Sequence, residues 1–180
     1  MKKTFTLFTV SLLIGIKVNA QNIFTAIKEN DALAVKSLLS GGFDANIKDE
    51  NGATPLINAI KADQNRIVIM LLQKNVDIDT KDNDGNTALI VACQNNRTDA
   101  MYLLASHFPD VNIKNKLGQT ALITAVNNAN VDVVDYLVHH NAKLKAKDNQ
   151  NRSALDYAKI SNNTEILNLL NGPASTLSAK

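Results

Sequence analysis

Cysteine is almost absent from this sequence, because Cys93 is the only one in 180 residues. A single thiol cannot form an intramolecular disulfide, even in an oxidising compartment where such bonds persist. We therefore expect the packing of an apolar core, rather than covalent cross-links, to hold the fold together.

Histidine is also scarce, with three residues, His107, His139 and His140. Neighbouring residues of a helix point about 100° apart, so His139 and His140 do not share a helix face. A zinc site requires i, i+3 or i, i+4 spacing and further ligands. We interpret this pair as lying near a helix C-terminus, where the helix dipole favours a cation. A small hydrolase that uses Asp156 or these two histidines is an alternative, and it would require a convergent cleft.

Patterns that bind cofactors or metal ions are missing as well. The sequence contains no glycine-rich loop of the phosphate-cradling type. Asp77 and Asp79 suggest a calcium loop, but the remaining ligands of such a loop are absent. Asp110 and Asn112 occupy the equivalent positions 33 residues later, which makes the pattern part of a repeat. We therefore predict a protein that is not an enzyme and that uses no cofactor or metal.

One apolar run is present near the start of the chain, from Phe5 to Ile16, after Lys2 and Lys3. The small residues of Val18–Ala20 have the spacing of a cleavage site, so residues 1–20 are predicted to be a signal peptide cleaved after Ala20. The run is too short for a comfortable membrane span, although a signal anchor is the alternative. The predicted location is the periplasm or the extracellular medium, with no membrane insertion after cleavage.

Loss of the signal peptide changes the charge of the chain. The 19 basic residues include Lys2, Lys3 and Lys17, so 16 remain against 17 acidic residues, a net charge of −1. A nearly neutral chain with mixed charges argues against a nucleic acid or an anionic membrane as the partner.

The rest of the sequence repeats every 33 residues. Four segments align in register: DENGATPLINAI (49–60), DNDGNTALIVAC (82–93), NKLGQTALITAV (115–126) and DNQNRSALDYAK (148–159). The aligned columns hold one residue class each: Gly52, Gly85, Gly118 and Asn151; Thr54, Thr87, Thr120 and Ser153; Leu56, Leu89, Leu122 and Leu155. A fixed period of this size predicts a stack of structural repeats.

Each repeat reads as a turn followed by two short helices. Glycine after aspartate, as at Gly85, suits a turn with positive φ, and Thr87 then has the position of a helix N-cap. Pro55 fits the first position of a helix. The apolar stripe in residues 67–71 has helical period and predicts the second helix. Cys93 aligns with Ile60 and Val126, and we interpret it as a core residue.

Asparagine recurs where helices must stop. It is the non-glycine residue that best tolerates the left-handed conformation. We therefore predict such stops at Asn30, Asn75, Asn96, Asn141 and Asn162.

A single helix pair cannot bury its apolar face, so neighbouring pairs must stack. The sequence predicts an all-α solenoid of about five helix-turn-helix units with β-turn tips. The predicted units are 21–48, 49–81, 82–114, 115–147 and 148–171, followed by a flexible tail, 172–180.

The segments GATPLINAI, IVIMLL and VDID resemble the ankyrin repeat, and the resemblance extends from about Gln21 to Asn171. Ile57, Ile90 and Ile123 stand where that family usually has histidine, so its side-chain link between turn and helix is expected to be missing. The resemblance implies a scaffold that binds another protein through its turn tips and the exposed side of its first helices, which line a concave face.

Transferred to this sequence, the resemblance identifies two sets of candidate contact residues. The turn-tip positions are Glu50, Asn51, Ala53, Asn83, Asp84, Asn86, Lys116, Leu117, Gln119, Asn149, Gln150 and Arg152. The first-helix positions are Lys61, Gln94, Asn95, Asn127 and Asn128. Leu117, an apolar side chain on a turn tip, is the best single anchor. The alternative is that all of these are solvated loop residues, since single exposed apolar residues are common.

The resulting hypothesis is a protein-protein interaction scaffold in the bacterial envelope, monomeric and bound to a partner that the sequence does not identify. The alternative is a secreted effector or inhibitor that binds and blocks an enzyme.

Overall fold

The computed structural model describes residues 23–172. The predicted signal peptide and residues 173–180 of the predicted tail lie outside this range. After a helical stretch at residues 23–28, the helices are α2 (Ala32–Ser40), α3 (Pro55–Lys61), α4 (Asn65–Leu72), α5 (Ala88–Gln94), α6 (Thr98–Ala105), α7 (Ala121–Asn127), α8 (Val131–His139), α9 (Ala154–Ile160) and α10 (Thr164–Asn171). Across residues 23–172, the only extended pairing is an isolated bridge between Lys147 and Ser153.

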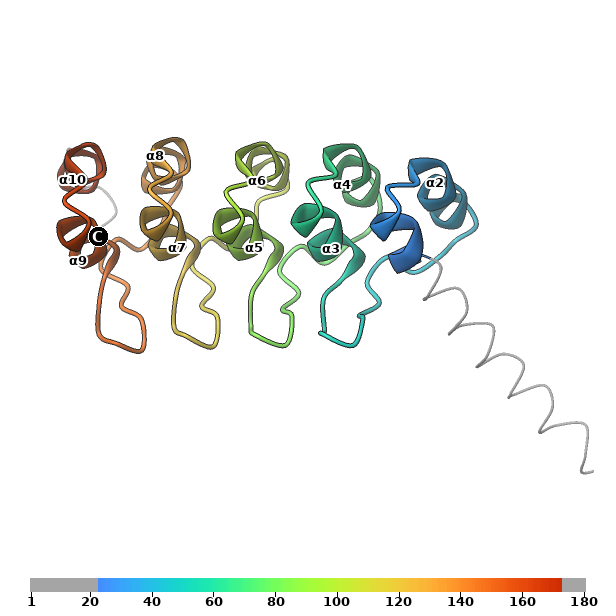
Figure 1. The fold of residues 1–180 in the computed structure, drawn as a ribbon, viewed down its shortest axis with the longest axis horizontal. Helices are drawn as coiled ribbons and strands as arrows, with labels where there is room; N and C mark the ends of the chain where they lie inside the picture. The colour runs from blue at the N-terminus through green and yellow to red at the C-terminus, as the bar shows by residue number, and fades with distance from the viewer. Residues whose placement is uncertain (1–22, 173–180) are drawn as a thin grey trace, which may run out of the picture.

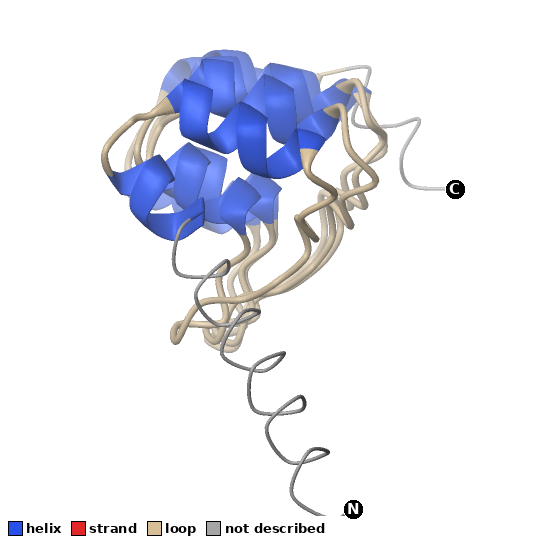
Figure 2. Ribbon diagram, turned by 90° about the vertical axis from the view of Figure 1, so that its right-hand side faces the viewer, coloured by secondary structure: helices blue, strands red, loops and turns tan. Residues whose placement is uncertain are grey.

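The helices form two parallel rows (Figure 1). One row contains α3, α5, α7 and α9, the other contains α2, α4, α6, α8 and α10, and the long loops extend together beyond the first row. Viewed along the stack, successive pairs superimpose and the loops form a bundle on one side (Figure 2). The predicted all-α repeat solenoid is confirmed.

The first helix of each unit begins at the predicted cap. The hydroxyl oxygens of Thr54, Thr87 and Thr120 accept hydrogen bonds from the N–H three residues ahead, at 3.3, 3.4 and 3.3 Å. Ser153 does the same at 3.3 Å, and the Asp156 carboxylate accepts from the Ser153 N–H in return. Because an N-cap of this kind contributes about 1 kcal/mol, four aligned caps fix where these helices start.

Most of the predicted asparagine stops are confirmed. The residues Asn30, Asn96, Asn141 and Asn162 have positive φ, between 52° and 63°. The prediction for Asn75 is wrong, since it is not among the positive-φ residues of the described range. There the Val76 N–H donates to the Lys74 carbonyl at 2.8 Å, whereas after α8 the aligned Ala142 N–H donates to the Leu137 carbonyl at 3.1 Å, so the chain leaves α4 by another route.

The core runs through the stack between the two rows of helices. Ile57, Ile90 and Ile123 are at most 1% exposed, which explains the absence of histidine at this position. Cys93 is 2% exposed, and burial raises the pKa of its thiol to about 12. The interpretation of Cys93 as a core residue is confirmed.

The units are also linked by a ladder of lysines that the repeat alignment did not reveal. The Nζ atom of Lys48 donates to the carbonyl of Lys81 at 2.8 Å, Lys81 to Lys114 at 3.1 Å, and Lys114 to Lys147 at 2.6 Å. Each lysine lies 33 residues after the previous one. The same contact therefore links each of the first three units to the next.

The aspartate pair that suggested calcium also joins neighbouring units. Both carboxylate oxygens of Asp79 lie 3.2 Å from the Asp110 N–H, which donates to them, and Asp77 accepts from the Asp79 N–H at 3.1 Å. Burial raises the pKa of Asp79; the Asp110 N–H opposes this, while the charges of Asp110 and Asp77 add to it. These carboxylates therefore have a structural role in loop-to-loop contact.

Candidate protein-binding surface

Each turn tip is closed by the side chain at its first residue. The Oδ1 atom of Asp82 accepts hydrogen bonds from the N–H groups of Asp84 at 3.0 Å and Asn86 at 2.8 Å. The aligned Asp49, Asn115 and Asp148 make the same pair of bonds, at 2.9 to 3.0 Å. A side chain that satisfies two backbone donors in this way fixes the shape of the turn.

Successive turns are hydrogen-bonded to each other. The N–H of Asn83 donates to the Asn51 carbonyl at 2.9 Å, that of Lys116 to Asp84 at 2.9 Å, and that of Asn149 to Leu117 at 3.0 Å. The four tips therefore form one continuous edge, and side chains on this edge are held at fixed spacing before any partner binds.

Glycine permits this close approach. Gly52 has φ +70°, and a Cβ atom added there would lie 2.4 Å from Oδ1 and 2.9 Å from the backbone N of Asn83. The aligned Gly118, with φ +75°, would meet Asn149 at 2.5 and 2.7 Å in the same manner. Any side chain at these positions would push neighbouring turns apart.

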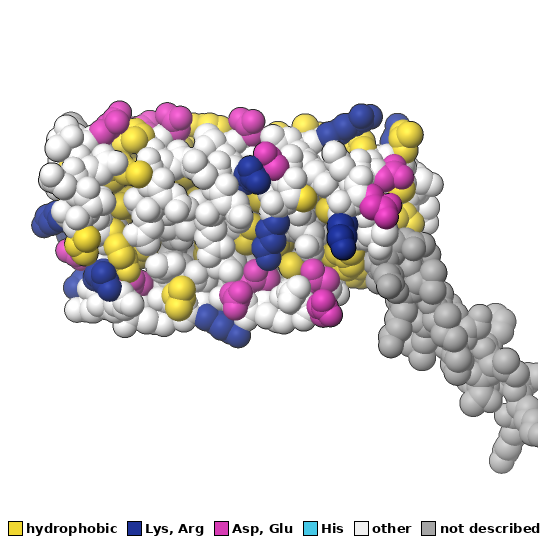
Figure 3. Space-filling model, viewed as in Figure 1, with side chains coloured by type: hydrophobic (Ala, Val, Ile, Leu, Met, Phe, Trp, Pro, Cys, Tyr) yellow, Lys and Arg dark blue, Asp and Glu magenta, His cyan; other side chains and the backbone are white. Residues whose placement is uncertain are grey.

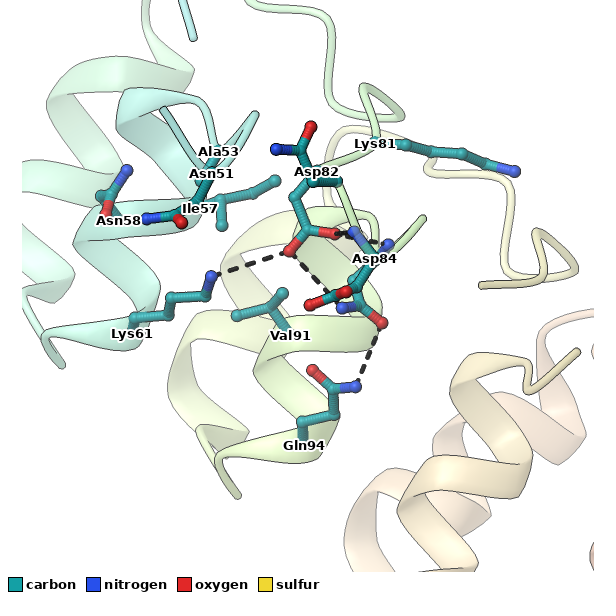
Figure 4. Close-up of polar contacts among 12 residues, drawn as sticks. Asn51, Ala53, Ile57, Asn58, Lys61, Lys81, Asp82, Asp84, Val91 and Gln94 are labelled. Atoms are coloured by element: carbon teal, nitrogen blue, oxygen red, sulfur yellow. Dashed lines mark hydrogen bonds and ion pairs between the residues drawn. The ribbon is translucent and has the colours of Figure 1, made fainter. Parts of the chain in front are cut away.

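A polar network connects the second turn to the helices on both sides (Figure 4). Lys61, the last residue of α3, lies 3.6 Å from Oδ2 of Asp82, whose side chain is 4% exposed. Gln94, the last residue of α5, donates to the side-chain oxygen of Asn86 at 3.1 Å. Since Lys61 and Gln94 are themselves exposed, this network orients two surface residues towards the turn edge.

The link between turn and helix is made by a residue other than the expected one. The side-chain amide of Asn58 donates to Asp49 at 2.9 Å, and the Tyr157 hydroxyl donates to Asp148. Both donors lie nine residues after the carboxylate, one position beyond the missing histidine. The histidine link of the family is missing at Ile57 as expected, but Asn58 makes a different link in that unit, and Tyr157 makes one in the last unit.

The last turn has a distinct charge environment. Burial acts to raise the pKa of Asp148, but hydrogen bonds from the Tyr157 hydroxyl and from the N–H groups of Arg152 and Gln150 outweigh it, so the pKa lies below its ordinary value. The same bond to Asp148 raises the pKa of Tyr157. The Arg152 guanidinium carbon lies 5.1 Å from the centre of the Tyr157 ring, so a cation and an aromatic ring are held together beside this tip.

Most of the candidate contact residues lie on this exposed edge. The exposed ones are Glu50, Asn51, Lys61, Asn83, Asp84, Gln94, Asn95, Lys116, Leu117, Asn127, Asn128, Asn149 and Gln150, and the half-buried ones are Gln119 and Arg152. We call these fifteen residues the turn-and-helix surface. Their role in binding stays a prediction.

Two candidates, Ala53 and Asn86, lie in the interior. Ala53 is 1% exposed and Asn86 is 6% exposed. Both directly follow the turn glycine, and their N–H groups donate to the carboxylate that opens the turn. The Asn86 side-chain oxygen also accepts from Asn115 at 3.0 Å. The prediction that these two residues contact a partner is wrong, because neither side chain reaches the surface.

The turn-and-helix surface changes in character along the stack. Acidic side chains gather at the first turns, whereas apolar and basic side chains lie towards the C-terminal units (Figure 3). Leu117 is 62% exposed, and Ile160, which sequence reasoning missed, is 67% exposed. Ile160 occupies the same column as Lys61, Gln94 and Asn127, so the repeat alignment contained the signal that could have identified it.

The two adjacent histidines lie away from this surface, at the end of a helix as predicted. His139 is the last residue of α8 and its Nδ1 lies 3.3 Å from an Asp135 carboxylate oxygen. His140 instead stacks on the Tyr136 ring at 3.7 Å. Within residues 23–172, no group of three His, Cys, Asp or Glu residues is arranged to hold a metal ion, and none of the helices there has the length and apolarity to span a bilayer.

Comparison with known proteins agrees with this architecture. A family model described as ankyrin repeats in three copies matches residues 23–115 and again residues 102–177. A search of curated proteins found no match. The two matched stretches together span most of the sequence, and the chain belongs to the ankyrin repeat family.

Proposed function

We propose that this protein is an exported scaffold that binds a partner protein through the turn-and-helix surface. Ankyrin repeats are generally protein-protein interaction modules. The observation that carries the proposal is the hydrogen-bonded edge of turns, from which Leu117 and Asp84 project without side-chain bonds of their own. Because the backbone that carries these side chains is already fixed, binding has little cost of ordering the turns.

The proposed location is the bacterial envelope. Its support comes from the sequence, where Lys2 and Lys3 precede an apolar run and a small-residue cleavage pattern that ends at Ala20. The burial of Cys93 suits an oxidising compartment, because a buried thiol is protected from forming cross-links with other molecules.

A pull-down from envelope extract tests the proposal. The bait is residues 21–180, compared with the double variant Asp84→Arg/Leu117→Asp, in which both changes fall on exposed turn tips. The matched control, Asp132→Arg/Phe108→Asp, makes the same types of change at exposed positions outside the turn-and-helix surface. We expect one specific partner to be retained by the control and lost by the turn variant. Equal capture by all three baits would refute the proposed surface.

The alternative function is that of a secreted effector or inhibitor that blocks an enzyme. Leu117 and Ile160, both more than half exposed, are suitable for insertion into a cleft of an opposing protein. Fractionation of the producing cells separates the two functions, since a protein confined to the periplasm argues against action outside the cell.

A further inference from the structure

A groove lies between α2 and α4. Both helices belong to the row of second helices, away from the turn tips (Figure 1). The volume of the groove is about 380 Å³. The apolar part of its lining includes Leu33, Ile69 and Met70, and the charged part consists of Lys36, Arg66 and Lys74. The groove shares no lining residue with the turn-and-helix surface.

One apolar side chain of the groove, Leu33, is more exposed than any large apolar side chain on α4, α6, α8 or α10. Leu33 is 74% exposed and Ile69 is 42% exposed. In the other units, the column of Leu33 holds charged residues, namely Arg66, Asp99, Asp132 and Glu165. The first unit therefore has a large apolar side chain at a position that is charged in every other unit.

The charged part carries one sign. The nine residues that line the groove include three cations and no acid. The ion pairs formed within residues 23–172 involve Lys61, Arg97 and His139, and not the cations of the groove. The groove therefore offers positive charge that no carboxylate of the described chain pairs with directly.

The remainder of the same row has the opposite charge. Asp99, Asp132, Asp135 and Glu165 are exposed on α6, α8 and α10. Along the upper edge in Figure 3, basic side chains gather at the N-terminal end and acidic ones follow towards the C-terminal end. Within this row, the positive region thus lies at the groove between α2 and α4.

We propose that this groove binds an amphipathic helix of another protein, with its apolar face against Leu33 and Ile69 and with carboxylates facing Lys36, Arg66 and Lys74. An apolar strip between cations complements an apolar face flanked by acids. An anionic membrane fits less well, because a flat surface against this row would also meet the acids of α6, α8 and α10. Segments of this chain outside the structure, residues 1–22 and 173–180, contain no Asp or Glu.

The test is a selection from a display library against the purified chain. The library holds helices of about four turns with a fixed leucine stripe at i, i+3, i+4 and i+7, flanked by random Glu, Lys, Ser or Ala. We expect the selected helices to be enriched in Glu beside the stripe. The best of them is then synthesised, labelled and titrated by fluorescence anisotropy.

Two variants locate the binding. The charge reversal Lys36→Glu/Arg66→Glu should weaken binding of the selected helix at least about tenfold, since exposed charge pairs are replaced by repulsion. The control Lys143→Glu/Lys145→Glu changes the net charge equally at exposed loop positions and should leave affinity within about twofold. Circular dichroism establishes that both variants keep the helical fold, and Ile69→Ser should weaken binding without any change of charge.

Several results would overturn the proposal. These are the selection of no helix, selected helices without acidic enrichment, or binding that is indifferent to Lys36→Glu/Arg66→Glu. Light scattering that shows self-association of the chain, abolished by the same reversal, would assign the groove to a second copy. Vesicles of phosphatidylglycerol that bind through the same cations when no helix is selected would assign it to lipid.

Discussion

Replacement of Gly52 by alanine should destabilise the protein far more than the same replacement at Gly42. Both glycines have positive φ, +70° at Gly52 and +84° at Gly42. A Cβ atom at Gly42 would have no heavy atom within 4 Å, whereas one at Gly52 would lie 2.4 Å from the Asn83 side-chain oxygen and 2.9 Å from its backbone nitrogen. Gly42→Ala therefore measures the conformational cost of alanine alone, and Gly52→Ala adds the cost of moving neighbouring turns apart.

The magnitudes follow from these contacts. A left-handed alanine costs about 1–2 kcal/mol at either position. At Gly52 the turns must also move apart. This movement would lengthen or break two hydrogen bonds, from the Asn83 N–H to the Asn51 carbonyl and from the Asn83 side-chain amide to the Glu50 carbonyl. At about 1 kcal/mol for each hydrogen bond, we expect a loss of about 3–4 kcal/mol for Gly52→Ala and about 1–2 kcal/mol for Gly42→Ala.

Urea unfolding followed by circular dichroism measures both losses, with the slope of the transition compared among the proteins so that the free energies of unfolding are comparable. Gly118→Ala serves as a replicate, since its Cβ atom would meet Asn149 in the same way. Equal losses for Gly52→Ala and Gly42→Ala would refute the inference that the contact between turns requires glycine.

Three further predictions concern single side chains. Tyr157→Phe should lower stability by about 1.5 kcal/mol at neutral pH, because it removes a hydrogen bond to a charged group. Since the folded-state pKa of Asp148 is depressed, this stabilisation is present above the unfolded pKa and is lost as the pH falls through the folded pKa, so unfolding curves of the variant and the parent should converge in acid. Cys93 should resist alkylation at pH 8 until the chain unfolds, because its pKa is about 12 and its side chain is buried; rapid labelling of the folded protein would contradict its position in the core. Lys81→Met should lower the free energy of unfolding by about 1 kcal/mol through loss of its bond to the next unit, while Lys36→Met should leave it unchanged. Thermal melts of both variants test this prediction.

The repeat architecture could be predicted because its determinants are local. A threonine cap bonds a backbone group three residues away, and a turn glycine acts on its own φ, so both leave a mark at fixed spacing in the sequence. Asn75 shows the limit of such reasoning. It shares a column with Asn141, which has positive φ, although the carbonyls of both residues accept the same kind of bond from a side-chain amide of the preceding unit, Asn46 and Asn112 respectively. The residue type alone therefore does not decide the backbone conformation in this column.

The candidate surface was predictable to a similar extent. Exposure follows from position on a turn or helix face for residues such as Leu117, but Ala53 and Asn86 show that a turn tip also has inward positions. The position of a residue within a turn does not by itself specify whether its side chain points outward or inward. The groove between α2 and α4 could not be predicted, because it depends on how side chains of two units lie against each other in space.

The lysine ladder has a consequence for how this protein can change in length. Each inner lysine gives a hydrogen bond to the unit ahead and its carbonyl receives one from the unit behind. A duplicated unit inserted between Lys81 and Lys114 would therefore meet a lysine Nζ donor on one side and a lysine carbonyl acceptor on the other. Its own lysine would provide the matching acceptor and donor. Tandem duplication within the gene would therefore preserve this lysine contact at the new junctions while it lengthens the stack and the row of turn tips.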